Sequence, residues 1–162
     1  DASGNDLRKK LAKKFNVQTK NVVIGSGSEG IMSTIMRTFL LNDDEIISSK
    51  GSFIGFRVLA DASGRHVHWV PMKNYHYDLE KMAEKITDYT KIIYIANPDN
   101  PMGTYIKKTD FDNFYSYVPS RVLIILDEAY YEFAKFQSDY PDSMHYRYDN
   151  VITLRSFSKA YG

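Results

Sequence analysis

The stretch "RVLIILDEAY", residues 121–130, contains five consecutive apolar residues, which are followed directly by two carboxylates. It shows no alternation of polar and apolar residues, which is typical of a strand buried on both faces of a parallel sheet. The stretch "KIIYIANP", residues 91–98, has the same character and is broken by a proline. Two such strands predict a sheet that is covered by helices on both faces.

The rest of the chain alternates between helical and extended patterns. Helices are predicted at residues 3–15, 28–41, 53–64, 78–86 and 109–118, and further strands at 21–25, 44–49, 66–72 and 150–159. Ser3 and Asp6 resemble a capping box, Asp78 is a candidate N-cap, and Gly64 is a candidate helix stop. This order predicts an α/β fold, a three-layer sandwich with a mostly parallel sheet between two layers of helices.

Composition places the chain among ordinary globular proteins. Its 162 residues are 43% hydrophobic and 25% charged, which suits one domain spanning residues 1–162. A net charge of +1 does not indicate a surface that binds nucleic acid. No apolar run is long enough to cross a membrane. The chain has no cysteine, which fits a cytoplasmic location. We therefore expect neither a nucleic acid nor a membrane as partner.

A glycine-rich turn, "GSGSEG" at residues 25–30, follows a predicted strand and opens a helix. Its G-x-G-x-x-G spacing matches the dinucleotide-binding fingerprint, but the acidic residues 43–45 stand before the "IISS" of the next predicted strand and not at its end. A second interpretation is a phosphate cradle made by the backbone N–H groups of Gly27, Ser28 and Glu29 at a helix N-terminus. A tight turn with serine caps is the third.

Three further motifs follow predicted strands in turn. They are "NPDNPMG" at residues 97–103, "LDEAYYEF" at 126–133 and "SFSKAYG" at 156–162. Ligands of parallel sheets bind beyond the carboxyl ends of the strands, where these motifs stand. With the glycine turn, the four motifs make the whole chain resemble the large domain of fold-type-I pyridoxal-phosphate-dependent aminotransferases. The resemblance is strongest to the histidinol-phosphate aminotransferase branch.

The resemblance implies a role for each motif residue. Lys159 would form the Schiff base with pyridoxal 5'-phosphate and then move a proton as base and acid, so Lys159, Asp127 and Tyr130 are the predicted catalytic residues. Asp127 would keep the pyridine nitrogen protonated. Asn100 and Tyr130 would hydrogen-bond the phenolic oxygen of the ring, and Phe53 would stack on it.

The phosphate of the cofactor would lie at the glycine turn. By the same resemblance, Ser156 and Ser158 would join Gly27, Ser28 and Glu29 around it. The implied substrates are an amino-acid-like donor, histidinol phosphate, and a 2-oxo acid, 2-oxoglutarate. The implied assembly is a homodimer.

Other functions stay open on the sequence alone. The same lysine and aspartate would serve another aromatic amino-acid aminotransferase or a pyridoxal-phosphate-dependent phospho-amino-acid decarboxylase. A non-catalytic binding module is a third class, although a binder needs no reactive amine. His66 and His68 alternate on a predicted strand with no further ligand at metal spacing, so we interpret them as structural and expect no metal site.

Two departures and three absences qualify the resemblance. Met102 stands where the family commonly has threonine, and Gly30 stands where it has an acidic residue. A phosphate-binding arginine, a substrate-carboxylate arginine and a tyrosine from the partner subunit are expected outside residues 1–162. We therefore expect the chain to be the cofactor-binding core of a longer protein, and to be inactive alone.

Overall fold

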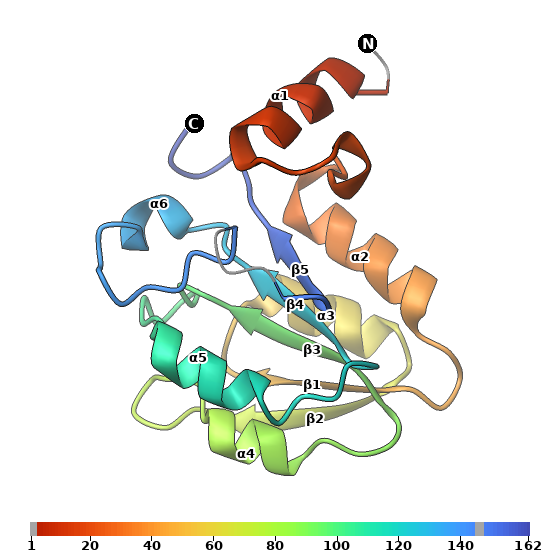
Figure 1. Ribbon diagram of the computed structural model, residues 1–162. Helices are drawn as coiled ribbons and strands as arrows, with labels where there is room; N and C mark the ends of the chain where they lie inside the picture. Colours follow the sequence, from red (N-terminus) through yellow and green to blue (C-terminus); the bar gives the residue numbers. More distant parts are fainter. Residues whose placement is uncertain (1–2, 145–147) are drawn as a thin grey trace.

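The computed structural model describes residues 3–144 and 148–162, and a five-stranded sheet forms its centre (Figure 1). The strands are β1 (Glu45–Lys50), β2 (His66–Pro71), β3 (Thr90–Ala96), β4 (Leu123–Asp127) and β5 (Val151–Leu154). All neighbouring pairs are parallel, in the order β2-β1-β3-β4-β5. The predicted α/β fold with a parallel sheet is confirmed.

Helices cover both faces of this sheet. The helices are α1 (Asn5–Phe15), α2 (Gly27–Phe39), α3 (Ile54–Ala62), α4 (Leu79–Glu84), α5 (Lys108–Tyr115) and α6 (Tyr131–Ala134), with a 3₁₀ turn, η1, at Thr19–Asn21. Side chains of α2 and α3 pack in one apolar cluster, and those of α4 and α5 pack in the other. Within the described residues, none of the helices combines the length and apolarity that a bilayer crossing requires.

The two clusters explain why the central strands lack polar alternation. On β4, Ile124 and Leu126 belong to the cluster under α4 and α5, whereas Ile125 belongs to the cluster under α2 and α3. On β3, Ile92 and Ile93 divide in the same way, and both are fully buried. Every side chain of such a strand faces a helix, so the apolar run is continuous.

One predicted strand is wrong. Residues 21–25 pair with no strand of the sheet, and η1 occupies the beginning of the segment. Val23 and Ile24 are 73% and 40% exposed. The apolar pattern was typical of a strand, but a strand also needs a neighbour with free backbone groups, and this segment lies away from the sheet.

The helix and strand ends agree in part with the sequence. Asp78 caps α4 by accepting a hydrogen bond from the Lys81 N–H at 3.1 Å, and Gly64 follows α3 with a φ of 69°, as predicted. The capping box predicted at α1 is wrong in its position, because the N-cap is Gly4 and not Ser3. The strand predicted at residues 150–159 ends at Leu154, so the following residues form a loop and a turn.

Candidate active site

A pocket of about 200 Å³ lies at the carboxyl edge of the sheet. It is lined by Ser26, Gly27, Ser28, Glu29, Phe53, Tyr94, Ala96, Pro98, Asn100, Asp127, Ala129, Tyr130, Ser158 and Lys159. Apart from Tyr94, which lies inside β3, these residues end or follow a strand or begin α2. The pocket therefore includes the point where the strand order reverses, between β1 and β3. Nine of the ten predicted cofactor residues line this one pocket, and Ser156 does not.

Asp127 is the buried carboxylate of the pocket. It ends β4, where its Oδ2 accepts a hydrogen bond from the Tyr94 hydroxyl at 3.0 Å and its Oδ1 accepts one from the Ala129 N–H at 3.1 Å. Burial raises the pKa of Asp127, while these two hydrogen bonds and the charge of Lys159 act in the opposite direction. The carboxylate is thus fixed in place, and a cation bound beside it would favour its ionised form.

Tyr94 is a pocket residue that the sequence reasoning missed. It lies inside β3 with its side chain fully buried, and its ring stacks on Phe56 of α3 at a centroid distance of 3.9 Å. Burial and then the Asp127 charge raise the pKa of Tyr94, so its hydroxyl stays protonated and donates to Asp127. The available signal was a single hydroxyl within a buried apolar strand, because such a hydroxyl needs a partner.

Lys159 lies in the turn after β5, with its Nζ 5.2 Å from the centre of the Tyr130 ring. This turn also brings Ser158 to the pocket wall. Ser156 lies behind Ser158, and their hydroxyls are 2.7 Å apart. The Ser156 hydroxyl also accepts the Ser158 N–H at 3.1 Å, so Ser156 supports the turn.

The N-terminus of α2 also lines the pocket, through Ser26, Gly27, Ser28 and Glu29. Gly27 has a φ of 68°, a conformation that favours glycine, and the N-cap Ser26 makes no side-chain cap hydrogen bond. The interpretation of this turn as serine-capped is therefore wrong. The Gly27 N–H donates to Gly25 O at 2.9 Å, so Ser28 and Glu29 are the better candidates for anion donors in this helix turn.

Phe53 reaches the pocket from the loop after β1, and Gly55 lies directly behind it. A Cβ at position 55 would lie 2.6 Å from both Phe53 Cζ and Glu29 Oε1. Such distances are far below van der Waals contact, so a larger residue would displace the Phe53 ring. Gly55 is thus a second residue that sequence reasoning missed, although a glycine inside a helical pattern often has a packing reason.

The loop after β3 is held by its own side chains. The amide of the buried Asn97 accepts from the Ile106 N–H at 2.8 Å and donates to Ile106 O at 3.3 Å. The Asp99 carboxylate accepts the Met102 N–H at 3.1 Å. These contacts close the loop, which brings Asn100 to the pocket wall beside Tyr130.

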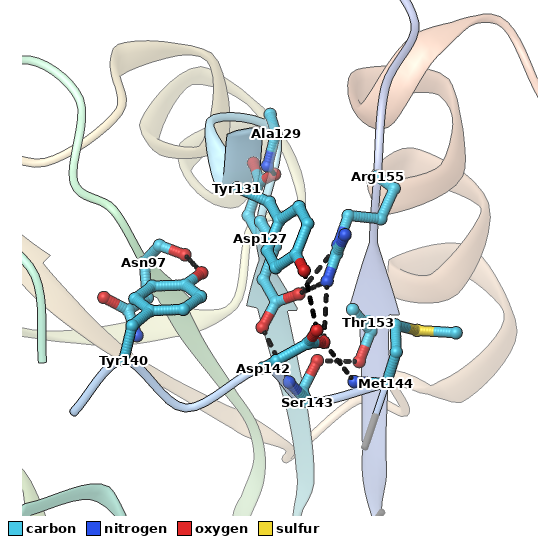
Figure 2. Close-up of polar contacts among 11 residues, drawn as sticks. Asn97, Asp127, Ala129, Tyr131, Tyr140, Asp142, Ser143, Met144, Thr153 and Arg155 are labelled. Carbon is cyan, nitrogen blue, oxygen red and sulfur yellow. Dashed lines mark hydrogen bonds and ion pairs between the residues drawn. The ribbon is translucent and has the colours of Figure 1, made fainter. Parts of the chain in front are cut away.

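An ionic network fixes the exit of β5 (Figure 2). The Arg155 Nη2 lies 2.6 Å from Glu128 Oε2 and 3.0 Å from Asp142 Oδ1, and its guanidinium lies over the Tyr131 ring at 3.4 Å. The Ser143 N–H donates to Glu128 at 3.2 Å. Burial raises the pKa of Glu128 to about 7, while Arg155 acts in the opposite direction. The network joins the end of β4 to the strand that leads to Lys159.

Comparison with known proteins agrees with this architecture. Residues 3–162 match the family model described as "Aminotransferase class I and II". The chain is 38% identical over 163 residues to histidinol-phosphate aminotransferase 2 of Haemophilus influenzae, covering all of this chain and 44% of that protein. It is 36% identical over 158 residues to histidinol-phosphate aminotransferase 2 of Carboxydothermus hydrogenoformans, covering 96% of this chain and 44% of that protein.

A solved structure gives the same result. The chain superposes on histidinol-phosphate aminotransferase from Sinorhizobium meliloti, solved in complex with pyridoxal-5'-phosphate, with a TM-score of 0.89 and 31% identity. The match covers all of this chain and 44% of that one. The chain thus spans less than half the length of the relatives that it matches.

Proposed function

The chain belongs to the class I and II aminotransferases, and from this premise we propose that its pocket binds pyridoxal 5'-phosphate for amino-group transfer. The proposed donor is histidinol phosphate or a similar amine, and the proposed acceptor is a 2-oxo acid such as 2-oxoglutarate. The observation that carries the proposal is the meeting of Lys159, Asp127 and the α2 N-terminus around one pocket.

The donor set of the pocket fits this cofactor. The buried Asp127 carboxylate is the partner that a protonated pyridine nitrogen requires, and it is already oriented by two hydrogen bonds. The first turn of α2 and the Ser158 hydroxyl supply the donors that a phosphate requires. Phe53 offers an apolar ring at the pocket wall, and Asn100 and Tyr130 offer polar groups for an anionic phenolic oxygen.

Pyridoxal phosphate, when bound, supplies an aldehyde carbon for the amino group and an electron-withdrawing ring. Lys159 would hold the cofactor covalently through Nζ and, once displaced by the substrate, would take the proton from the substrate Cα and return it. Asp127 would hold a proton on the pyridine nitrogen through its charge. The Arg155 network would orient the turn that carries Lys159, because Arg155 ties β5 to Glu128 at the end of β4.

The experiment is a spectrum followed by product analysis of the full-length protein. We expect a visible band that borohydride removes in the wild type and that is missing in Lys159→Ala. With histidinol phosphate and 2-oxoglutarate we expect glutamate as a product. Release of CO₂ from a phospho-amino acid would favour the decarboxylase, and absence of the band at saturating pyridoxal phosphate would contradict the cofactor assignment.

Further proposals concern the whole protein. We propose that residues 1–162 form the cofactor-binding part of a longer homodimeric enzyme of the cytoplasm. The greater length is supported by the relatives, of which the chain covers 44%. Sedimentation of the full-length protein tests the dimer, and an assay of residues 1–162 alone tests whether this part is inactive.

A further inference from the structure

Three potential metal ligands meet at the amino edge of the sheet, opposite the pocket. Glu45 begins β1 and pairs in register with His66, which begins β2, and His68 follows two residues later. Residues i and i+2 of a strand face the same side, and directly paired residues do as well. One carboxylate oxygen and one nitrogen from each imidazole all lie within 4.8 Å of one another.

We propose that Glu45, His66 and His68 bind a divalent transition-metal ion, with Zn²⁺ as the best match. Two imidazoles and one carboxylate form a ligand set that zinc accepts, leaving a fourth position for water. A tetrahedral ion with bonds of about 2.1 Å holds its ligand atoms about 3.4 Å apart. His68 Nε2 lies 3.0 Å from Glu45 Oε2 in a hydrogen bond, and the ion would take the place of the proton between them.

The Glu45 carboxylate is held in place by a hydrogen bond and is largely buried. The Thr87 hydroxyl donates to Glu45 Oε2 at 2.6 Å, which orients the carboxylate in the way that outer hydrogen bonds orient metal ligands. The side chains of Glu45 and His68 are only 18% and 20% exposed, which limits competition by water.

The cluster also has an entrance. His66 is exposed, and its ring meets the His68 ring edge-on at a centroid distance of 4.5 Å. An ion can therefore reach the two imidazoles from solvent and complete its coordination with water. Because the ligands come from β1 and β2, a bound ion would join these two strands at their start, away from Lys159 and Asp127.

The test is a zinc titration of the full-length protein, freed of metal by chelation and followed by calorimetry. We expect one binding event that weakens at least about tenfold in His66→Asn and in Glu45→Gln. His76→Asn is the matched control, because the His76 ring is exposed and bonds the Asn74 carbonyl outside the cluster. His66 is also exposed, so its replacement should not unfold the protein.

Two outcomes decide the proposal. Loss of zinc affinity in the cluster variants, with the control unchanged and the Co²⁺-loaded wild type showing a visible band of four-coordinate cobalt, supports it. Equal zinc binding by wild type and His66→Asn, or no binding by the wild type, overturns it. The visible band of bound pyridoxal phosphate serves as the folding control, since it reports on the opposite edge of the sheet.

Discussion

The hydrogen bond from Tyr94 to Asp127 predicts a kinetic defect when the hydroxyl is removed. Tyr94→Phe keeps the ring that stacks on Phe56 and deletes only the oxygen that donates to Asp127 Oδ2 at 3.0 Å. The Ala129 N–H on Oδ1 would then be the remaining hydrogen bond to this buried carboxylate. The ionised form of Asp127 loses stabilisation, and its pKa rises further.

The size of the effect follows from the type of bond. A hydrogen bond to a charged group contributes about 1.5–3 kcal/mol. If Asp127 transmits most of this energy to the protonated pyridine nitrogen, kcat/KM falls by roughly 10- to 100-fold, since each 1.36 kcal/mol corresponds to about a factor of ten. Affinity for pyridoxal phosphate should fall as well, and the pH midpoint of its visible band should move upward.

The assay compares Tyr94→Phe with Tyr115→Phe. The Tyr115 hydroxyl bonds the Asn150 side chain under α5, so its loss removes a half-buried hydroxyl without touching the pocket. The control should keep the pH midpoint and lose only stability. If Tyr94→Phe leaves kcat/KM, cofactor affinity and the pH midpoint within about twofold of the wild type, the hydroxyl does not act through Asp127.

Four other changes have defined outcomes in the full-length protein. Lys159→Ala should abolish the borohydride-sensitive band and nearly all turnover, while equilibrium dialysis still detects pyridoxal phosphate; normal turnover would reject its role. Asp127→Asn should lower kcat by more than about tenfold with a small change in melting temperature. Gly55→Ala should weaken cofactor binding in a fluorescence titration, because the added carbon would meet Phe53 Cζ at 2.6 Å. Folding raises the pKa of Glu128 from 4.5 to about 7. Between pH 4.5 and pH 7 the folded state therefore binds more protons than the unfolded state. The free energy of unfolding should fall by about 3 kcal/mol as the pH rises across this range. In urea unfolding at several pH values, the free energy of unfolding of Glu128→Gln should not show this decrease. A decrease as large as that of the wild type would contradict the assignment of the raised pKa to Glu128.

The sheet could be predicted from sequence where burial alone decides the pattern. Residues 91–98 and 121–130 are apolar without interruption because both faces of β3 and β4 are covered. The same reasoning was wrong for residues 21–25, because an apolar pattern does not show whether a neighbouring strand is available. Val23 is a residue type that is common in strands, but its segment pairs with no strand and its side chain is 73% exposed.

Most of the pocket was predictable for a topological reason. In a parallel sheet, the residues after each strand meet at one edge, so motifs that are distant in sequence converge without any knowledge of side-chain packing. Tyr94 and Gly55 escaped this reasoning because neither follows a strand. The role of Tyr94 depends on which way β3 faces, and that of Gly55 depends on where the Phe53 ring lies.

The register of the sheet explains why the amino edge was interpreted differently from the carboxyl edge. His66 and His68 have no third ligand near them in sequence, which favoured a structural role. Glu45 stands on another strand, and only the pairing of β1 with β2 brings it beside His66. The carboxyl edge collects loops whose sequences carry motifs, whereas the amino edge collects single residues inside strands. A set of metal ligands at the amino edge therefore forms no motif in the sequence, and it can be recognised only once the strand register is known.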